Sequence, residues 1–485
     1  MPSLYRPPPT FADASAADAG LLDAVTAGAA RLTPAQGLEL FHRMPLVELG
    51  RLADARCRAI HGDAIRTYVI DRNINYTNVC TAKCTFCAFR RDAEDHDAYT
   101  LEHGRLYEKI EELVGIGGTQ VLMQGGMNPA LPLEWYTTLL RGIKERFAGA
   151  NGGRGVHVHG FSPPEFIEFV RFFDPPGATL FDKVLSVIRP LREAGLDSVP
   201  GGGGEIFAAP VRRKIGLGKC DAESWLTVMK AAHSLGMFTS ATMMFGHIEG
   251  YADRVHHMAT VREWQDRAMR DGGSEGGPGG HYKAFISWPF QRENTPLGRV
   301  RDWGDRPEEL EPGALFPGDA VATLDGDGDA RSHPEFGRRV RRAGAVEYLR
   351  TQAISRLMLD NVYSIGASWV TMGPHIGQVA LSFGANDMGS VMMEENVVSA
   401  AGTTYCLNEP VLCRLIREAG FTPAQRDNAY DLLRVHDASR AGEAGYCPDL
   451  AVTDWSAHRA KRLHAERPAA GEAAPVQVTV TAGAK

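Results

Sequence analysis

The sequence predicts an α/β protein built on a TIM-type (β/α)8 barrel. Short β-rich runs alternate with amphipathic helical patterns along the chain, and seven or eight such strand–loop–helix units are present. Repeated units of this kind indicate a parallel sheet with right-handed crossovers. Most of the unusual residue clusters directly follow a predicted strand, which is where a barrel carries its chemistry. An open, doubly wound sheet is the alternative that this pattern allows.

The predicted elements begin with a helical segment. Apolar residues recur three and four positions apart over 34–62, which is typical of helices that bury one face. Helices are also expected at 101–115, 133–147, 163–173, 222–235 and 254–269. The predicted strands are TYVIDRNINYT, TQVLMQGG, VHVHGFSPP, LDSVPGGGG, FTSATMMFGH and KAFISWPF, with ASWV and ALSFGAN as further candidates.

The composition divides the chain into one large domain with additions. Residues 1–33 are rich in Ala and Pro and are expected to form a flexible N-terminal extension, and 441–485 a flexible C-terminal tail. The barrel is assigned to 34–440. Insertions are expected near 271–280, which is Gly-rich, and at 298–344, which is charged and rich in Pro and Gly. Such compositions bury little apolar surface, so they predict loops or linkers.

Charge and cysteine content exclude several classes of protein. The formal net charge is −7, which argues against a nucleic-acid or anionic-membrane partner. The N-terminus has no basic flank leading into an apolar core, so it does not resemble a signal peptide. The uncharged stretch 361–386 contains Pro374 and several glycines, which suit turns better than a membrane helix. Eight sparse cysteines indicate a reducing compartment, so a cytoplasmic protein is expected.

Three cysteines are the strongest chemical signal. Cys80, Cys84 and Cys87 follow the first predicted strand with Cys-x3-Cys-x2-Cys spacing. Three thiolates on one loop are suited to three irons of a [4Fe-4S] cluster. No fourth cysteine follows at a suitable spacing, so one iron is left open for a chelating ligand. The alternative is a zinc site in a non-enzyme, with His96 as the fourth ligand.

The cysteine run, with an aromatic residue before its last cysteine, resembles the radical S-adenosylmethionine superfamily. The resemblance implies a [4Fe-4S] cluster and S-adenosyl-L-methionine as cofactors, with the methionine moiety chelating the open iron. It places Phe86 near the adenine and the Gln124-Gly125-Gly126 motif against the methionine, where glycine permits close approach. Glu205, which follows four glycines, is implied to bind the nucleoside ribose, with Ser162 as a further cofactor contact. The four glycines also fit a simple tight turn.

Longer motifs narrow the resemblance. NINYTNVCTAKCTFCAFRR, HGFSPPE, GLDSVPGGGGEIF and AFISWPFQRENTPLG are similar to the subfamily of futalosine-pathway menaquinone enzymes and the deazaflavin (FO) precursor synthase. Within it, GASWVTMGPHIGQVALSFGANDMGSVMMEENVVSAAGT and GFTPAQRD most resemble the cyclic dehypoxanthinyl futalosine synthases. Aminofutalosine synthase and then the FO precursor synthase are the alternatives.

The resemblance implies an intramolecular ring closure of dehypoxanthine futalosine. A 5′-deoxyadenosyl radical would abstract the hydrogen at ribose C4′, and the carbon radical would add to the benzoate ring. Recovery of aromaticity then requires loss of one electron and one proton, so a base is needed. The electron that starts the reaction implies a cellular reductant such as flavodoxin or ferredoxin.

Candidate residues for substrate chemistry lie at predicted strand ends. His247 and Glu249 close the fifth predicted strand and are candidates for the base. His159 shares a strand face with His157 and is a third catalytic candidate, although a structural histidine explains it equally well. Asn386 and Glu394 are the candidate substrate-binding residues, while an exposed helix start is the alternative for this acidic stretch. A benzoate also requires a cation or N–H donors, for which Arg90, Arg91 and Arg212 are candidates.

Overall fold

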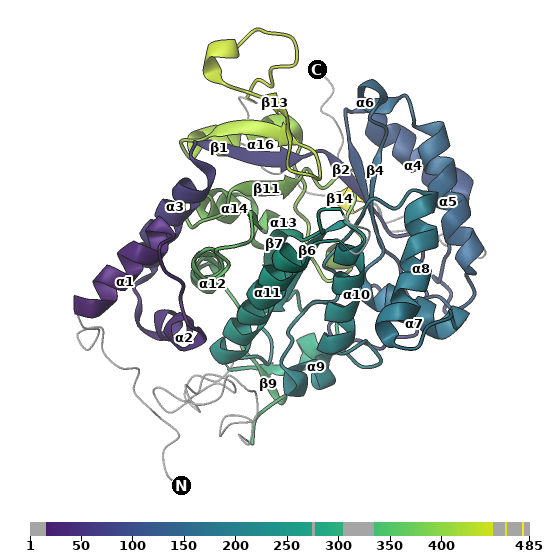
Figure 1. Cartoon of the computed structure of the whole chain (residues 1–485), viewed down its shortest axis with the longest axis horizontal. Coiled ribbons are helices and arrows are strands. Elements are labelled where there is room, and N and C mark those ends of the chain that lie inside the picture. The colour runs from purple at the N-terminus through teal and green to yellow at the C-terminus, as the bar shows by residue number, and fades with distance from the viewer. Residues whose placement is uncertain (1–15, 274–276, 304–333, 450–460, 463–477, 480–485) are drawn as a thin grey trace.

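The computed structural model describes residues 16–273, 277–303, 334–449, 461–462 and 478–479 (Figure 1). Its helices are α1 Ala16–Ala27, α2 Pro34–Arg43, α3 Leu46–His61, α4 His103–Gly115, α5 Leu133–Arg146, α6 Ala150–Gly153, α7 Pro163–Phe173, α8 Leu180–Ala194, α9 Ala209–Ile215, α10 Ala222–Ser234, α11 Tyr251–Asp271, α12 Ala345–Met358, α13 Trp369–Met372, α14 Pro374–Ala380, α15 Val397–Ala400 and α16 Glu409–Glu418. Its strands are β1 Ile65–Val69, β2 Asp71–Ile74, β3 Gln120–Met123, β4 His157–Gly160, β5 Ser198–Val199, β6 Phe238–Phe245, β7 Tyr282–Pro289, β8 Arg301–Asp302, β9 Arg339–Val340, β10 Ser364–Gly366, β11 Asp387–Ser390, β12 Thr422–Arg426, β13 Leu432–Val435, β14 Lys461–Arg462 and β15 Val478–Thr479.

The main sheet curls back on itself. Only Ile70 separates β1 from β2, so the two form one bent segment. β1 pairs in parallel with β11, and β2 pairs in parallel with β3. From β3 the parallel pairing continues through β4, β5, β6, β7 and β10 to β11. The ladder therefore returns to the segment where it began, which confirms the predicted barrel and not the open sheet.

Helices cover the outside of this sheet. Figure 1 shows α4, α5, α7, α8 and α10 around one side, with α11 and α12 beside β6 and β7. Each buries an apolar stripe; in α5 the buried residues include Tyr136, Leu139, Leu140 and Ile143. α7 begins at Pro163 behind a capping box, in which Ser162 and Glu165 satisfy the free backbone donors of the first turn. The local sequence therefore determines where this helix begins.

The N-terminal segment is described in part. Within 1–33, residues from 16 onward are described, and α1 packs against α3. Val25 and Leu32 are buried in the main core. Arg31 bridges Asp266 and Asp360, with nitrogen–oxygen distances of 2.6 Å in both pairs. Residues 16–33 therefore pack against the barrel through Val25, Leu32 and Arg31, and their expected flexibility stays a prediction. Residues 1–15 lie outside the described residues.

The other additions are described in part. In 298–344 the described ends pair as β8 and β9, and Arg341 N donates to His247 O at 2.6 Å. Residues 304–333 and 274–276 lie outside the described residues. At the start of the expected tail, Cys447 is buried and its N–H donates to His436 Nδ1 at 3.0 Å. Residues 441–449 therefore contact the barrel instead of leaving it.

Two predicted strands are displaced. The run ASWV overlaps α13, and the strand lies just before it, at β10. The run ALSFGAN covers the end of α14 and a turn, and the strand follows as β11. Apolar runs of this length do not distinguish a buried strand from a buried helix, which explains both errors.

A hairpin near the C-terminal end of the described chain closes the amino-terminal end of the barrel. β12 pairs in parallel with β1 and antiparallel with β13. Just after β12, Asn428 donates to Ser198 Oγ at 2.8 Å, at the first residue of β5. Gln425 Nε2 donates to Gly117 O at 3.2 Å, just before β3. The hairpin therefore forms a floor beneath the interior.

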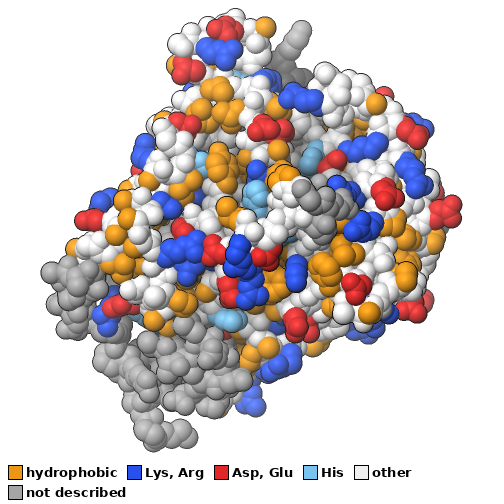
Figure 2. Space-filling model, viewed as in Figure 1, with side chains coloured by type: hydrophobic (Ala, Val, Ile, Leu, Met, Phe, Trp, Pro, Cys, Tyr) orange, Lys and Arg blue, Asp and Glu red, His pale blue; other side chains and the backbone are white. Residues whose placement is uncertain are grey.

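The molecular surface is mixed in charge. On the face in Figure 2, basic and acidic side chains are interspersed among apolar ones. This agrees with the net charge of −7. Across the described ranges, no helix combines the length and apolarity that crossing a membrane requires.

Candidate functional site

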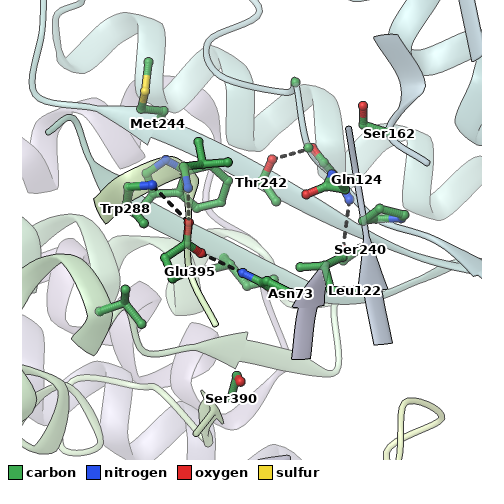
Figure 3. Close-up of a pocket in the computed structure, with 18 of the residues that line it drawn as sticks. Asn73, Leu122, Gln124, Ser162, Ser240, Thr242, Met244, Trp288, Ser390 and Glu395 are labelled. Atoms are coloured by element: carbon green, nitrogen blue, oxygen red, sulfur yellow. Dashed lines mark hydrogen bonds between the residues drawn. The ribbon is translucent and has the colours of Figure 1, made fainter. Parts of the chain in front are cut away.

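A cavity of about 500 Å³ occupies the barrel interior. Alternate residues of the strands face it, as the period of two requires. Figure 3 shows Asn73 of β2, Leu122 of β3, and Ser240 and Thr242 of β6 around it. It extends from the loops at the carboxyl ends of the strands, including all three motif cysteines, to the floor residues Arg426, Asn428 and Tyr430. One chamber thus connects the two ends of the barrel.

The cysteine loop is held by backbone hydrogen bonds. Cys80 N donates to Arg91 O at 3.0 Å, and Cys87 N donates to Cys84 O at 3.2 Å. Lys83 N reaches Leu217 O at 2.8 Å, which ties the loop to the segment after α9. All three cysteines are half-buried and line the cavity. The loop therefore presents three thiols to one space.

Electrostatics around the thiols fits a metal cluster. Burial raises the pKa of Cys84 to about 12, and the ammonium of Lys219 opposes this shift. A metal would stabilise the thiolates that burial disfavours. In the described part of the chain, no three His, Cys, Asp or Glu side chains are placed to share a single ion, and His96 is exposed. His96, the fourth ligand that the zinc alternative requires, therefore does not line the cavity with the three thiols.

The glycine motif packs directly against the cysteine loop. A Cβ on Gly126 would lie 2.1 Å from Val79 O, and one on Gly125 would lie 2.5 Å from the Tyr76 ring. Both positions therefore require glycine. Gly125 N donates to Glu165 Oε1 at 3.1 Å. A backbone without side chains is thus exposed to the cavity at this point.

Glu165 organises the wall behind this motif, and sequence reasoning missed it. Its Oε1 also accepts from Tyr76 Oη at 2.5 Å, while its Oε2 accepts from Ser162 N at 2.7 Å and Ser162 Oγ at 2.6 Å. The side chain is almost completely buried. It joins the glycine motif to the start of α7. The Ser-x-x-Glu pattern of a capping box is the sequence signal that could have identified it.

Glu205, the predicted nucleoside contact, lines the cavity. Lys219 Nζ donates to its Oε1 at 2.7 Å, while Oε2 is buried and has no partner among the described residues. Its φ of 43° is unusual for a non-glycine residue, and such strain is often found at functional sites. Lys219 Nζ also lies 5.1 Å from the centre of the Phe86 ring. Glu205, Lys219 and Phe86 form one group beside Cys84.

The four glycines before Glu205 are required by packing as well as by the turn. A Cβ on Gly201 would lie 2.6 Å from Ser240 O, and one on Gly204 would lie 2.4 Å from Thr242 O. Gly201 N donates to Ser240 Oγ at 3.0 Å, and its carbonyl accepts from Thr242 Oγ1 (Figure 3). The loop thus lies flat on β6, and this brings Glu205 to the cavity.

His159 faces the cavity from β4. Its Nδ1 lies 2.7 Å from Ser198 Oγ, which also contacts His157 Nε2 at 2.7 Å. The two histidines therefore share a strand face, as the alternation predicted. Burial lowers the pKa of His159 to about 3, and the nearby His157 and Arg426 add to the effect. The imidazole is neutral near pH 7.

Asp71, at the start of β2, is a carboxylate in the same interior. Its Oδ2 accepts from Gln120 Nε2 at 2.9 Å, whereas its Oδ1 is buried without a partner in the described part of the chain. Burial raises its pKa, whereas side-chain interactions with Ser390 and Gln120, and then the charge of Arg426, oppose the shift. Arg426 is itself paired with Asp387, at 2.5 and 2.9 Å. Sequence reasoning did not single out Asp71, because an Asp in a strand carries no motif.

The structure does not bring His247 and Glu249 to the cavity. Both are fully buried behind β6. Glu249 accepts from Gly246 N at 2.6 Å, His247 N at 2.8 Å and Arg254 Nη2 at 2.8 Å. Although burial has the opposite effect, the charges of His247 and Arg254 lower the pKa of Glu249. This network holds the turn between β6 and α11 together.

Asn386 and Glu394 also lie outside the cavity lining. Asn386 Oδ1 accepts from Arg356 Nη2 at 2.7 Å and Ile365 N at 2.8 Å. Glu394 is buried between Lys109 Nζ at 2.8 Å and Arg72 Nε at 2.6 Å.

The neighbouring carboxylate, Glu395, lines the cavity instead. It accepts from Asn73 Nδ2 at 2.6 Å (Figure 3) and from Val397 N at 2.8 Å. Successive residues of an extended segment face opposite sides, so a shift of one position separates a cavity residue from a residue of the wall.

Comparisons with known proteins agree with this site. The model of the radical SAM superfamily matches residues 74–261, and the CofH/MqnC C-terminal region matches residues 335–439. A cyclic dehypoxanthine futalosine synthase from Halalkalibacterium halodurans is 37% identical over 88% of this chain and 98% of its own length. The chain belongs to the radical S-adenosylmethionine superfamily.

Other members extend the comparison. An aminodeoxyfutalosine synthase from Thermus thermophilus is 32% identical over 85% of this chain and 95% of its own length. The crystal structure of methylornithine synthase (PylB) matches with a TM-score of 0.55 at 17% identity, over 83% of this chain and 97% of that one. This structural likeness supports the fold alone.

Membership makes the protein an enzyme that uses a [4Fe-4S] cluster and S-adenosylmethionine. The residues present fit both. Three thiols face one space, a glycine backbone is exposed beside them, and Glu205 Oε2 is an acceptor that no described residue occupies.

Proposed function

We propose that this protein is a radical cyclase that converts dehypoxanthine futalosine to cyclic dehypoxanthinyl futalosine, in menaquinone biosynthesis. The observation that carries the proposal is the identity of 37% to a cyclic dehypoxanthine futalosine synthase over nearly the whole of both chains. The Thermus aminodeoxyfutalosine synthase, at 32%, supports the second candidate function. The cavity of about 500 Å³ is large enough for a cofactor and a small substrate together.

The cofactor end is assigned to the residues near the cysteine loop. Cys80, Cys84 and Cys87 would hold the cluster, with the backbone of Gln124-Gly125-Gly126 along the methionine moiety. Glu205 Oε2 would accept from the ribose hydroxyls, with Phe86 near the adenine and Ser162 at the nearby wall. When bound, the cluster and S-adenosylmethionine would supply the radical that removes the hydrogen from ribose C4′. The chain itself orients the two partners and keeps water and stray hydrogen donors away.

We assign the proton acceptor of the ring closure to Asp71. A base must lie in the chamber with an accessible lone pair. Asp71 lines the chamber, Ser390 is a further polar contact of its carboxyl group, and its Oδ1 has no partner of good hydrogen-bond geometry among the described residues. Its raised pKa makes it a stronger base than an exposed aspartate. His159 is neutral and suits hydrogen bonding to the sugar. His247, Glu249, Asn386 and Glu394 are assigned to positioning the walls, since their polar atoms are occupied within the protein.

The electron that starts the reaction is assigned to an external carrier such as flavodoxin or ferredoxin, and the electron lost when the ring regains aromaticity would pass to the cluster or to another acceptor. The three cysteines are only half-buried, so the loop lies close to the surface. Short separation from the surface is what electron delivery from a partner protein requires. The partner would dock on the loop side of the barrel, opposite the floor.

The test uses anaerobically reconstituted protein with dithionite and S-adenosylmethionine. With dehypoxanthine futalosine, mass spectrometry should detect substrate-dependent 5′-deoxyadenosine and a product two hydrogens lighter than the substrate. A parallel incubation contains the enolpyruvyl benzoate that aminofutalosine synthase consumes. An adenosylated product there would replace the cyclase by the second candidate. Absence of both products, with the cluster present, would reject both substrates.

A further inference from the structure

An irregularity in β7 gives Lys283 an unusual position. Thr239 of β6 pairs with Tyr282, and the next residue, Ser240, pairs with Ala284. Lys283 is therefore the extra residue of a β-bulge. A bulge breaks the alternation of a strand and redirects a side chain, and bulges are frequent beside active sites. Lys283 lines the cavity, although regular pairing would give it and Ala284 opposite faces.

Lys283 differs from the other cations of the cavity. Arg90 is paired with Asp92, Lys219 with Glu205 and Arg426 with Asp387. Within the described residues, no carboxylate or other acceptor contacts Lys283 Nζ. Its ammonium lies 4.3 Å from the centre of the Phe238 ring, and its charge adds to the effect of burial in lowering the pKa of the nearby His281. Because a cation–π contact uses none of the hydrogen-bond donors of the ammonium, those donors stay available to an anion.

The arginines that the sequence suggested as ligands of a substrate carboxylate already have partners within the protein. Arg91 pairs with Asp97 at 2.7 Å. Arg212 donates to the carbonyls of Gly203, Gly204 and Cys220, at 2.8 to 2.9 Å. The cavity therefore has one cation available for a carboxylate, counted over the described residues that line it.

The depth of Lys283 suits the far end of a substrate. Phe238 pairs with Ser198, Ser198 pairs with His159, and His159 pairs with Leu122. These four residues therefore form one row across neighbouring strands. Leu122 lies three and four residues before Gly125 and Gly126, which is at most roughly 10–13 Å of extended chain at ~3.3 Å per residue. A molecule that reacts beside the methionine would therefore extend toward Lys283. Phe238 offers a flat apolar surface to an aromatic ring.

We propose that Lys283 binds the carboxylate of an aromatic-acid substrate and that Phe238 packs near its ring. This inference rests on the proposed function, which supplies a benzoate group. The ion pair would orient the ring so that the sugar points toward the cysteine loop. Lys283 is then a substrate-binding residue that determines specificity for a carboxylate.

The test compares Lys283→Met and Lys283→Arg with the wild-type holoenzyme. Lys230→Met is the matched control, because Lys230 is exposed and lies 5.3 Å from the centre of another phenylalanine ring, Phe181. Binding of dehypoxanthine futalosine is measured by anaerobic equilibrium dialysis without S-adenosylmethionine, and KM and kcat by product formation. Lys283→Met should raise Kd and KM at least tenfold with kcat within threefold, whereas Lys283→Arg and Lys230→Met should stay within threefold.

A second ligand, the primary carboxamide of the same substrate, makes the test independent of folding defects. Wild type should bind the amide at least tenfold more weakly than the acid, and Lys283→Met should bind both alike. Equal affinity of wild type for acid and amide would overturn the proposal, as would an unchanged Kd in Lys283→Met. If wild type binds the acid through Lys283 but forms no cyclic product, the proposed cyclase activity fails while the carboxylate site stands.

Discussion

The two ends of the chamber are built in different ways. At the cysteine end, each functional group lies in a short run of sequence: three cysteines within eight positions, a glycine pair, and four glycines before Glu205. At the floor, each group depends on a distant partner. Asp71 is held by Gln120, and Arg426 by Asp387. Cofactor binding therefore depends on local motifs, whereas the substrate surface depends on the assembled barrel.

This difference suggests that one end of the chamber is specialised for the cofactor and the other for the substrate. An end that holds one constant cofactor can be built from fixed motifs, while the opposite end can vary with the substrate. Relatives whose names refer to different reactions share 32–37% identity with this chain over most of its length. Substitutions at the two ends should therefore fail in different ways, and measuring cofactor cleavage separately from product formation would show it.

The largest effect is expected at the cysteine end. Cys84→Ala removes one of three thiolates, so the iron content should fall and 5′-deoxyadenosine should become undetectable, with or without substrate. Cys406→Ala, at a buried cysteine away from the cavity, is the control and should retain the brown cluster. Full deoxyadenosine production by Cys84→Ala would refute the cluster assignment.

The next largest effect is expected at the floor. Asp71→Asn removes the proposed base but preserves shape, so product formation should fall by ~10²–10⁴-fold, the usual contribution of general-base catalysis. Deoxyadenosine formation should continue, because its machinery lies at the other end. Liquid chromatography of both products decides this. Parallel loss of deoxyadenosine would show that the two ends are not independent.

The stability of the same variant gives a pH test with a definite sign. The pKa of Asp71 is raised by burial, so folding favours its protonated form. The stability that this protonated form contributes is complete below the unfolded pKa and is lost as pH rises through the raised folded pKa. The melting temperature of Asp71→Asn should therefore exceed that of wild type by more at pH 7 than at pH 4. A difference that is constant with pH would show that Asp71 is not shifted.

An intermediate effect is expected at Glu165, a positioning residue of the cofactor end. Glu165→Gln cannot accept from both Tyr76 and Ser162, and loss of a buried hydrogen bond costs about 1–3 kcal/mol. The KM for S-adenosylmethionine should rise roughly tenfold, while kcat at saturation changes little. Glu168→Gln on the same helix is the control. An unchanged KM would mean that the glycine motif keeps its position without this carboxylate.

The smallest effect on catalysis is expected at Glu394. Glu394→Gln leaves Lys109 without its carboxylate and Arg72 with Glu112 alone, so the free energy of unfolding should fall by about 3–5 kcal/mol, as for other broken buried pairs. Where the variant is still folded, kcat and KM should stay within threefold. Urea unfolding and steady-state kinetics measure both. A selective rise in substrate KM without loss of stability would return Glu394 to the substrate site.

The fold was predictable because its signal is repeated. Each strand–loop–helix unit carried its own periodicity, so the displaced assignments at ASWV and ALSFGAN did not alter the barrel. The cofactor end was predictable for the same local reason. Cys80, Gly126 and Glu205 line the cavity where their motifs suggested.

The substrate end was not predictable from single segments. Glu394 and Glu395 are adjacent, and only the path of the loop after β11 decides which one faces inward. His247 and Glu249 follow a strand, but the turn there directs both into a buried network with Arg254. Lys283 depends on a bulge, which appears only when the pairing of two strands is known.

The floor hairpin also fixes the order in which the chamber is completed during synthesis. The cysteine loop follows the first strand, whereas β12 and Asn428 leave the ribosome near the end of the chain. β12 pairs with β1, so a strand that emerges late in synthesis joins the first one made. Until β12 pairs with β1, the chamber has its cysteine loop but lacks its floor. A chain that ends before residue 422 would keep the cluster cysteines but lack the floor hairpin. Solvent could then reach any radical formed in the chamber.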